Sequence, residues 1–352
     1  MTTPADTPTK PHYPADLYDK TLEMISKSFM STDGLKDGSH NPLTFHMFYP
    51  PLLFGMMPML QETVLVNGQL SRMDKETLAS FVSNSNRCVF CTNAHQTMAE
   101  SLGADLDELQ RATEAEDPLA LSNKRPGEII KWMLAAQKKN APEISQINLK
   151  EEVPEIIGTA FKFNYINRVV DTFVTREKML PKKEGNSTAD RLLKKKRAPP
   201  LPGSAVEIME LSLKLPDDFS WAESNGPISQ VYIPQLVTDF VGKYIDENYD
   251  GSKPPLSRRW VFEVAEKLDG TESEEFAAAF MLLVSFARFQ IDESLKKDFE
   301  SHYQNFDTRR AMCAWAAFQT ARRIAGWQGE ALSRHLKKYL ENNGGRISTL
   351  AL

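Results

Sequence analysis

Apolar residues recur at helical spacing along most of this 352-residue chain, and stretches that alternate β-branched apolar residues with polar ones do not occur. Three stretches carry the helical pattern most clearly, at residues 50–64, 154–171 and 275–287. Proline, glycine and asparagine separate such stretches, and Pro58, inside the first, predicts a kink or a break. The sequence therefore predicts an all-α protein.

The helical pattern divides the chain into two halves. A basic, proline-rich stretch interrupts it, including a Lys-Lys-Lys-Arg run at residues 194–197, and this composition is typical of a linker. The run also resembles a targeting signal or an RNA contact, but the acidic balance of the chain favours a solvated linker. The predicted segments are a disordered N-terminus (1–14), a first helical domain (15–175), the linker (176–203), a second helical domain (204–340) and a C-terminal tail (341–352).

The two halves share an order of features. Residues 128–170 and residues 274–324 each contain an apolar helix, a spacer, and an aromatic helix that ends in a basic residue and aliphatic residues. We therefore expect two tandem repeats. The second repeat is degenerate, because no cysteine pair occurs in that half of the sequence.

Composition excludes several classes of protein. The net charge of −5 argues against a dedicated nucleic-acid binder, which is usually basic. The most apolar run, residues 276–289, is too short and too interrupted to span a membrane. The first residues lack the pattern of a signal peptide, and three cysteines do not make the disulfide framework of a secreted protein. We expect a cytoplasmic protein in a reducing compartment.

Two of the three cysteines lie close together, with a histidine after them. On a helix, Cys88, Cys91 and His95 share one face, because residues three and four positions apart are neighbours. Residues 83–87 are rich in helix-capping types, which predicts that Cys88 lies in the first turn of a new helix. The positive end of the helix dipole favours a thiolate there. In a reducing compartment such a pair indicates redox or metal chemistry.

A carboxylate precedes this motif by twelve positions. Glu76 lies near the start of the apolar run at residues 78–82, so an antiparallel helix pair would bring its side chain beside His95. Two thiols, an imidazole and a carboxylate would then meet. The pattern predicts sulfurs that alternate between dithiol and disulfide, with a proton relay attached.

These residues resemble a known family. Glu76, the motif Cys88-x-x-Cys91-x-x-x-His95 and the downstream residues 163–168 (Phe-Asn-Tyr-Ile-Asn-Arg) are similar to the AhpD-like alkylhydroperoxidases of the carboxymuconolactone decarboxylase superfamily. The resemblance covers about residues 40–175. The second half resembles the additional helical repeat of longer members, which ends here in the helix around residues 315–323.

The resemblance implies an all-helical, homo-oligomeric enzyme that needs no bound cofactor. In the family, the residue matching Cys91 attacks a small hydroperoxide or disulfide, and the one matching Cys88 then forms a disulfide with it. Glu76 and His95 would form the proton relay, and an external thiol or lipoyl-type donor would return the electrons. Some members carry a second histidine between the cysteines, where this chain has Phe90, so a shorter relay is expected.

Four further residues are candidates for the substrate pocket: Phe90, Phe163, Asn164 and Asn167.

Alternative hypotheses remain for the motif. Cys88, Cys91 and His95, completed by Glu76, form a candidate zinc site, although no fourth cysteine or second histidine lies nearby in the sequence. A non-catalytic interaction protein with vestigial cysteines is the other alternative. Thr92 after the second cysteine excludes the haem-attachment motif, and a thioredoxin-like site lacks its βαβ context. We expect a redox dithiol and no bound metal.

Overall fold

The computed structural model describes residues 50–140, 152–173 and 233–342, together with Lys20, Thr21, Glu23, Pro42, Phe45, His46, Pro142, Pro200, Leu201, Gly203 and Ala205. Every regular element within these residues is a helix, which confirms the all-α prediction. The predicted disordered N-terminus and nearly all of the predicted linker lie outside them. Among the described helices, none is long and apolar enough to cross a membrane.

The helices of the first half are α2 (Pro50–Leu60), the π-helical turn η3 (Gln61–Leu65), α3 (Arg72–Ser85), α4 (Val89–Ser101), α5 (Leu106–Glu114), the 3₁₀ turn η4 (Pro118–Ala120), α6 (Lys124–Ala135) and α7 (Val153–Phe173). The helices of the second half are α12 (Gln235–Asn248), α13 (Arg259–Ala265), α14 (Glu272–Phe286), the 3₁₀ turn η5 (Arg288–Gln290), α15 (Glu293–His302) and α16 (Phe306–Asn342).

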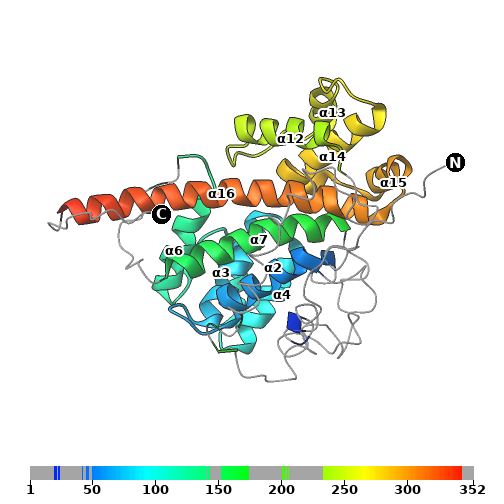
Figure 1. Ribbon diagram of the computed structural model, residues 1–352. Coiled ribbons are helices and arrows are strands. Elements are labelled where there is room, and N and C mark those ends of the chain that lie inside the picture. Colours follow the sequence, from blue (N-terminus) through cyan, green and yellow to red (C-terminus); the bar gives the residue numbers. More distant parts are fainter. Residues whose placement is uncertain are drawn as a thin grey trace.

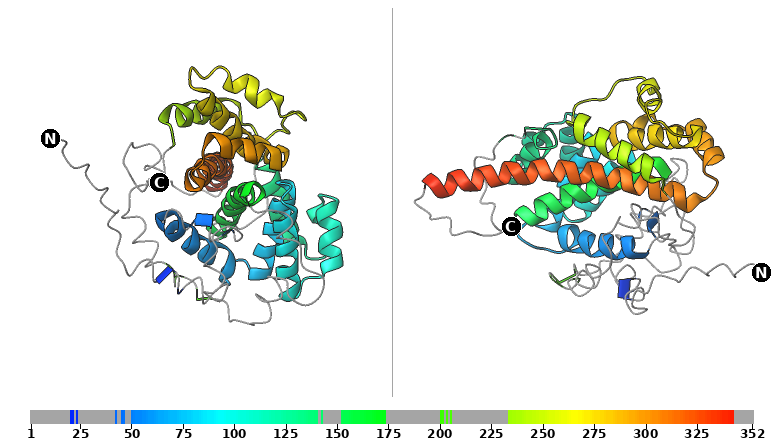
Figure 2. Two further views of the ribbon diagram at one scale, coloured as in Figure 1. Left: turned by 90° about the vertical axis from the view of Figure 1, so that its right-hand side faces the viewer. Right: turned by 45° about the horizontal axis from the view of Figure 1, so that its top comes forward.

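Two helices form the centre of the molecule, and the others lie on either side of them (Figure 1). Helices α7 and α16 run side by side in opposite directions, because Phe161 contacts Phe318 with ring centroids 5.6 Å apart and Phe173 contacts Phe306 at 5.8 Å. Such edge-to-face pairs each contribute about 0.5–1.5 kcal/mol beyond the area they bury. The end-on view in Figure 2 shows the first-half helices on one side of this pair and α12 to α14 on the other.

Buried polar contacts join the two halves. The guanidinium of Arg168, on α7, donates to the Tyr249 hydroxyl (3.1 Å) and to the backbone carbonyl of Ser285 (3.2 Å). The loop after α12 also contacts the end of α6: the Lys139 N–H donates to the Asp250 carbonyl at 3.0 Å. Gly251 follows with φ +79°, and a Cβ there would lie 2.3 Å from the Gln137 carbonyl oxygen, so this close approach requires glycine. One continuous hydrophobic core includes residues of both halves.

The end of α2 differs in detail from the simple helix break that Pro58 suggests. The α-helix continues through Pro58 to Leu60, and the π-helical turn η3 follows it. Thr63, in this turn, keeps a polar contact with the neighbouring helix, because its backbone carbonyl accepts a hydrogen bond from the Thr159 hydroxyl at 2.8 Å. The helix therefore does not end at Pro58, and its type changes three residues later.

Candidate active site

The cysteine motif lies at the junction of two antiparallel helices. The Ser71 hydroxyl caps α3 by accepting the Asp74 N–H at 3.1 Å. At the other end, a short turn leads into α4, and Arg87 adopts a left-handed backbone conformation in it (φ 57°). Arg87 is held there by its guanidinium, which lies 4.4 Å from the centroid of the Phe289 ring. Cys88 is the N-cap residue of α4, one position before the first helical turn that the sequence predicts.

The two sulfurs are in contact. Cys88 Sγ donates to Cys91 Sγ at 2.6 Å, and no disulfide joins them. Cys88 is completely buried, whereas Cys91, in the first turn of α4, retains 4% of its surface exposed. The side chain of Cys88 does not cap α4, and the first backbone N–H groups of a helix have no partner within the helix itself. A negative charge on sulfur is stabilised at such a position.

A carboxylate–imidazole pair lies one helical turn beyond Cys91. Oε2 of Glu76, on α3, lies 2.6 Å from Nδ1 of His95, which follows Cys91 by one turn on the same face of α4. The other carboxylate oxygen, Oε1, accepts a hydrogen bond from Arg72 Nε at 3.3 Å. Glu76 is fully buried, and both of its oxygens have partners. The structure therefore brings Glu76 and His95 together, as the helix-pair argument predicts.

This pairing sets the protonation pattern of the ring. A carboxylate only accepts hydrogen bonds, so a neutral His95 carries its proton on Nδ1, toward Glu76. Nε2 then presents a lone pair and can take up a proton. When it does, the nearby carboxylate stabilises the positive charge. The pair is thus arranged to accept a proton from a neighbouring acid and to release it again.

A cluster of amides supports the turn before Cys88. The Asn86 side chain donates to Oδ1 of Asn164 and Oδ1 of Asn167, each at 3.0 Å. Asn167 in turn donates to the Ser83 hydroxyl at 3.1 Å, and the Cys88 N–H donates to the Ser83 carbonyl at 2.9 Å. Asn164 and Asn167 are fully buried, so in this structure these two candidate pocket residues hold the turn of the motif.

The two aromatic candidates lie differently. The ring of Phe163 contacts His95 edge to face, with centroids 4.4 Å apart and an angle of 79° between the planes. This contact restricts the orientation of the imidazole. Phe90 is half-buried and packs against the core, and its neighbour Val89 is 66% exposed. The start of α4 therefore presents an apolar surface immediately beside the sulfurs.

Most of this chain is similar to a known protein. The alkyl hydroperoxide reductase Rv2159c of Mycobacterium tuberculosis is 30% identical to this chain over 294 residues, a match that covers 77% of this chain and 81% of the relative. The chain belongs to the AhpD-like family. The prediction of the family from the cysteine motif is thus confirmed. No protein-family model and no solved structure matches the sequence.

The zinc alternative has no geometric support in this AhpD-like chain. Among the described residues, no group of three or more histidine, cysteine, aspartate or glutamate side chains is arranged to hold a metal ion. His95 and Glu76 bind each other through Nδ1 and Oε2, as described above.

The third cysteine, Cys313, lies outside the motif and is fully buried on α16. Burial raises the pKa of its thiol well above the ordinary value, which favours the unreactive neutral thiol.

Three contributors to this AhpD-like site were not predicted: Arg72, Ser83 and Asn86. Arg72 precedes Glu76 by four residues, and this spacing on a helix is a recognisable ion-pair signal. Ser83 and Asn86 carry only the signal of helix-capping types, and their contacts with α7 join residues about eighty positions apart. No local pattern in the sequence indicates contacts of that kind.

Proposed function

We propose that this protein is a thiol-dependent hydroperoxide reductase that cycles Cys88 and Cys91 between dithiol and disulfide. The observation that carries the proposal is the contact between the two sulfurs, with the Glu76–His95 pair one helical turn beyond Cys91. The kinship with a protein named alkyl hydroperoxide reductase supports it. Glu76, His95, Cys88 and Cys91 are the proposed catalytic residues.

In the first step, His95 accepts the thiol proton of Cys91, and Glu76 stabilises the resulting imidazolium. The Cys91 thiolate attacks the terminal oxygen of the hydroperoxide. An S–O bond forms and the O–O bond breaks, so the sulfur is oxidised to a sulfenic acid and the peroxide is reduced to an alcohol. The leaving alkoxide takes a proton, for which Cys88 and His95 are the nearby donors.

In the second step, the Cys88 sulfur attacks the Cys91 sulfenic acid. An S–S bond forms, the S–O bond breaks, and water leaves with the proton. Because the two sulfurs already lie in contact, this reaction competes well with further oxidation of the sulfenic acid. An external dithiol, in our proposal a thiol or lipoyl-type donor, then reduces the disulfide and becomes oxidised itself. The same exchange chemistry would reduce a small disulfide substrate.

The roles of the two cysteines follow from their positions. Cys91 lies within the first turn of α4, one turn before His95, and it has the more exposed sulfur-bearing side chain. Cys88 is fully buried and precedes the helix. Small molecules therefore reach Cys91 more readily, and Cys88 reacts with the sulfenic acid formed at Cys91. Phe90 lies between the two cysteines in the sequence, and its side chain has no proton to donate. The proposed relay therefore contains a single histidine.

The proposal extends to the setting of the reaction. We place the enzyme in the cytoplasm, where small thiol donors are available, and we expect a homo-oligomer that assembles through helical faces. The chemistry needs no bound cofactor, because sulfur alone carries the two electrons. Phe163, which contacts His95, and Phe90 would lie beside the bound peroxide.

The test compares three cysteine variants in a peroxide-consumption assay with an excess of a dithiol reductant. Cys91→Ser should lower the rate at least about 1000-fold, because serine is a far weaker nucleophile and cannot form the sulfenic acid. Cys88→Ser should stop turnover after one equivalent and leave a sulfenic acid at Cys91 that dimedone traps. Cys313→Ser serves as the matched control and should retain the wild-type rate. Full activity in Cys91→Ser, or thiols inert toward peroxide in the wild type, would reject the proposal in favour of a non-catalytic interaction protein.

A further inference from the structure

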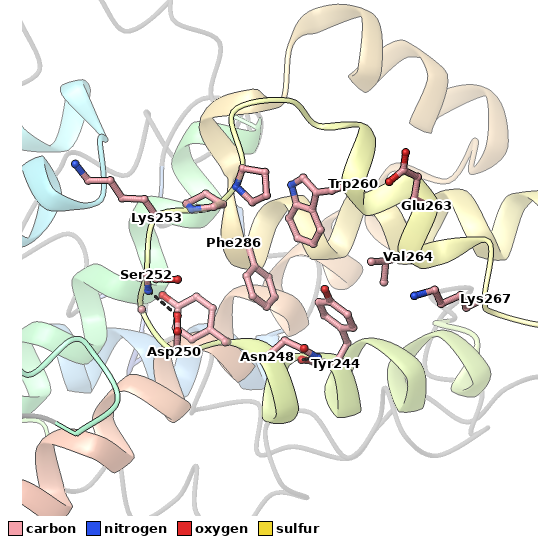
Figure 3. A pocket seen from close by; sticks show the side chains of 14 residues that line it. Tyr244, Asn248, Asp250, Ser252, Lys253, Trp260, Glu263, Val264, Lys267 and Phe286 are labelled. Carbon is pink, nitrogen blue, oxygen red and sulfur yellow. Dashed lines mark hydrogen bonds between the residues drawn. The ribbon is translucent and has the colours of Figure 1, made fainter.

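The second half contains a cavity that the proposed reaction does not use. It has a volume of about 420 Å³ and lies between α12 and α13, with Phe286 from the end of α14 at its base (Figure 3). Sites for small molecules in proteins usually range from about 300 to 1,000 Å³. The cavity is therefore large enough for a bicyclic organic molecule.

Three aromatic rings form a continuous apolar wall. Trp260 contacts Phe286 with centroids 5.6 Å apart, and Tyr244 contacts Phe286 at 5.8 Å. Tyr244 and Trp260 lie nearly parallel, with centroids 6.3 Å apart and planes inclined by 28°. Because each ring is held by the other two, the wall is formed before any ligand arrives. A flat apolar molecule suits such a wall.

The two acidic groups at the cavity are already engaged. The Asp250 carboxylate accepts the Ser252 N–H at 2.7 Å, and hydrogen bonds from the side chain and the backbone of Ser252 lower the pKa of Asp250. Glu263 forms an ion pair with Arg259 at 2.9 Å. Glu263 is thus paired with a cation of the protein, and the Asp250 carboxylate, which stays ionised, is held by Ser252 in its own loop.

The donors at the cavity are not engaged in this way. Within the described part of the chain, Lys253 and Lys267 form no ion pair, and the buried indole N–H of Trp260 has no acceptor. Figure 3 shows Lys267 beyond Tyr244 at one end of the aromatic wall and Lys253 at the other end. Burial raises the pKa of Tyr244, which keeps its phenol a neutral donor at neutral pH. The polar balance of the cavity therefore favours a ligand with a negative charge.

We propose that this cavity binds a small aromatic carboxylate, with its ring against Trp260, Tyr244 and Phe286 and its carboxylate at Lys267. The helical register supports the arrangement, because Trp260, Val264 and Lys267 follow one another on a single face of α13 and its C-terminal end. The facing helix contributes Tyr244 and Asn248, which are four positions apart. The site is separate from the cysteine motif and does not depend on the proposed peroxidase activity.

The test is isothermal titration of the full-length protein with sodium 2-naphthoate at pH 7, and with the uncharged 2-naphthamide as the paired probe. Wild type should bind naphthoate at one site and naphthamide more weakly, by up to about fivefold, since a partly exposed charge pair contributes up to about 1 kcal/mol. Lys267→Gln should weaken naphthoate binding by a similar factor. Lys267 is exposed, so this variant should fold normally.

Lys243→Gln is the matched control, because Lys243 is an exposed lysine of α12 that does not line the cavity. It should bind as the wild type does, and Trp260→Leu should bind more weakly. The proposal is overturned by the absence of saturable naphthoate binding up to about 5 mM, a concentration that detects even millimolar affinities. It is equally overturned if Lys267→Gln and Lys243→Gln titrate alike, or if naphthamide binds as tightly as naphthoate.

Discussion

The α3–α4 junction and the two central helices, α7 and α16, both bury ionisable side chains, but the surroundings of these side chains differ. At the junction, Glu76 is fully buried and both of its oxygens are paired, with His95 and Arg72. Cys313 on α16 and Lys162 on α7 are also buried, and burial shifts the pKa of each in the direction that favours its neutral form. The buried groups at the junction have hydrogen-bond partners, whereas burial without a partner favours the neutral form.

The cysteines make the comparison sharpest. Cys91 lies at the start of a helix one turn before a histidine, whereas Cys313 lies in the third turn of a 37-residue helix, between alanines and Trp315. A residue type that is reactive in one place is an inert packing group in the other. The difference comes from the backbone position and the partners of the thiol, since the side chains themselves are identical.

The largest expected effect is a difference in alkylation. In the native protein, iodoacetamide should modify Cys91 at least about 1000-fold faster than Cys313, because Cys313 reacts only when α16 opens locally. Mass spectrometry of timed digests measures both rates in one sample. In a denaturant the rates should converge. Equal rates in the native protein would remove the distinction between the two regions.

The second-largest expected effect is a loss of peroxide turnover when the charge of Glu76 is removed. Glu76→Gln keeps the size of the side chain but removes the charge that stabilises the protonated His95, and peroxide turnover should fall about 100-fold. Glu100→Gln, an exposed change on α4, is the control and should be neutral. Steady-state assays at several pH values measure the loss. An unchanged rate in Glu76→Gln would mean that the pair is structural only.

Lys162 tests how burial without a partner affects stability. Burial lowers the pKa of Lys162 from 10.5 to about 7, and its Nζ has no hydrogen-bond partner among the described residues. Between about pH 7 and pH 10.5, the unfolded chain binds a proton that the folded chain does not. The free energy of unfolding therefore increases as the pH is raised through this range, and it is lower at pH 7 than at pH 10.5. Replacing the amine by an apolar group should remove this dependence.

Lys162→Met should therefore raise the free energy of unfolding at pH 7 by about 2 kcal/mol and by less at pH 10. Urea denaturation at both pH values measures the change. Lys131→Met, at an exposed position of α6, should leave stability and its pH dependence unaltered. Destabilisation by Lys162→Met at pH 7 would show that the lysine has a favourable charged partner.

Local patterns predicted much of this structure. The period of the apolar residues predicts the helices, and the capping residues before Cys88 place it within one position of its observed place at the start of α4. The contact between Glu76 and His95 follows from their positions in the sequence, once the two helices that carry them are placed antiparallel. What local patterns do not indicate are contacts between distant segments, such as those of Asn86 with Asn164 and Asn167. Asn164 and Asn167 stay predicted pocket residues, and the sequence carries no signal that their amides also bind Asn86.

Helix ends and helix types were also less predictable. A π-helical turn follows Pro58, and α16 continues as one helix to Asn342 although its sequence changes from aromatic to charged residues. Tertiary packing decides such features, since intrinsic preferences differ by only a few tenths of a kcal/mol per residue. The two tandem repeats remain a prediction.

The central claim is that Cys88 and Cys91 form a redox-active pair, and intact mass after mild peroxide treatment tests it most directly. The account predicts a loss of two hydrogens per chain, located in the peptide that contains both cysteines, while Cys313 stays alkylatable after denaturation. Reduction by a dithiol should restore the original mass. An unchanged mass, or a disulfide that includes Cys313, would contradict the account.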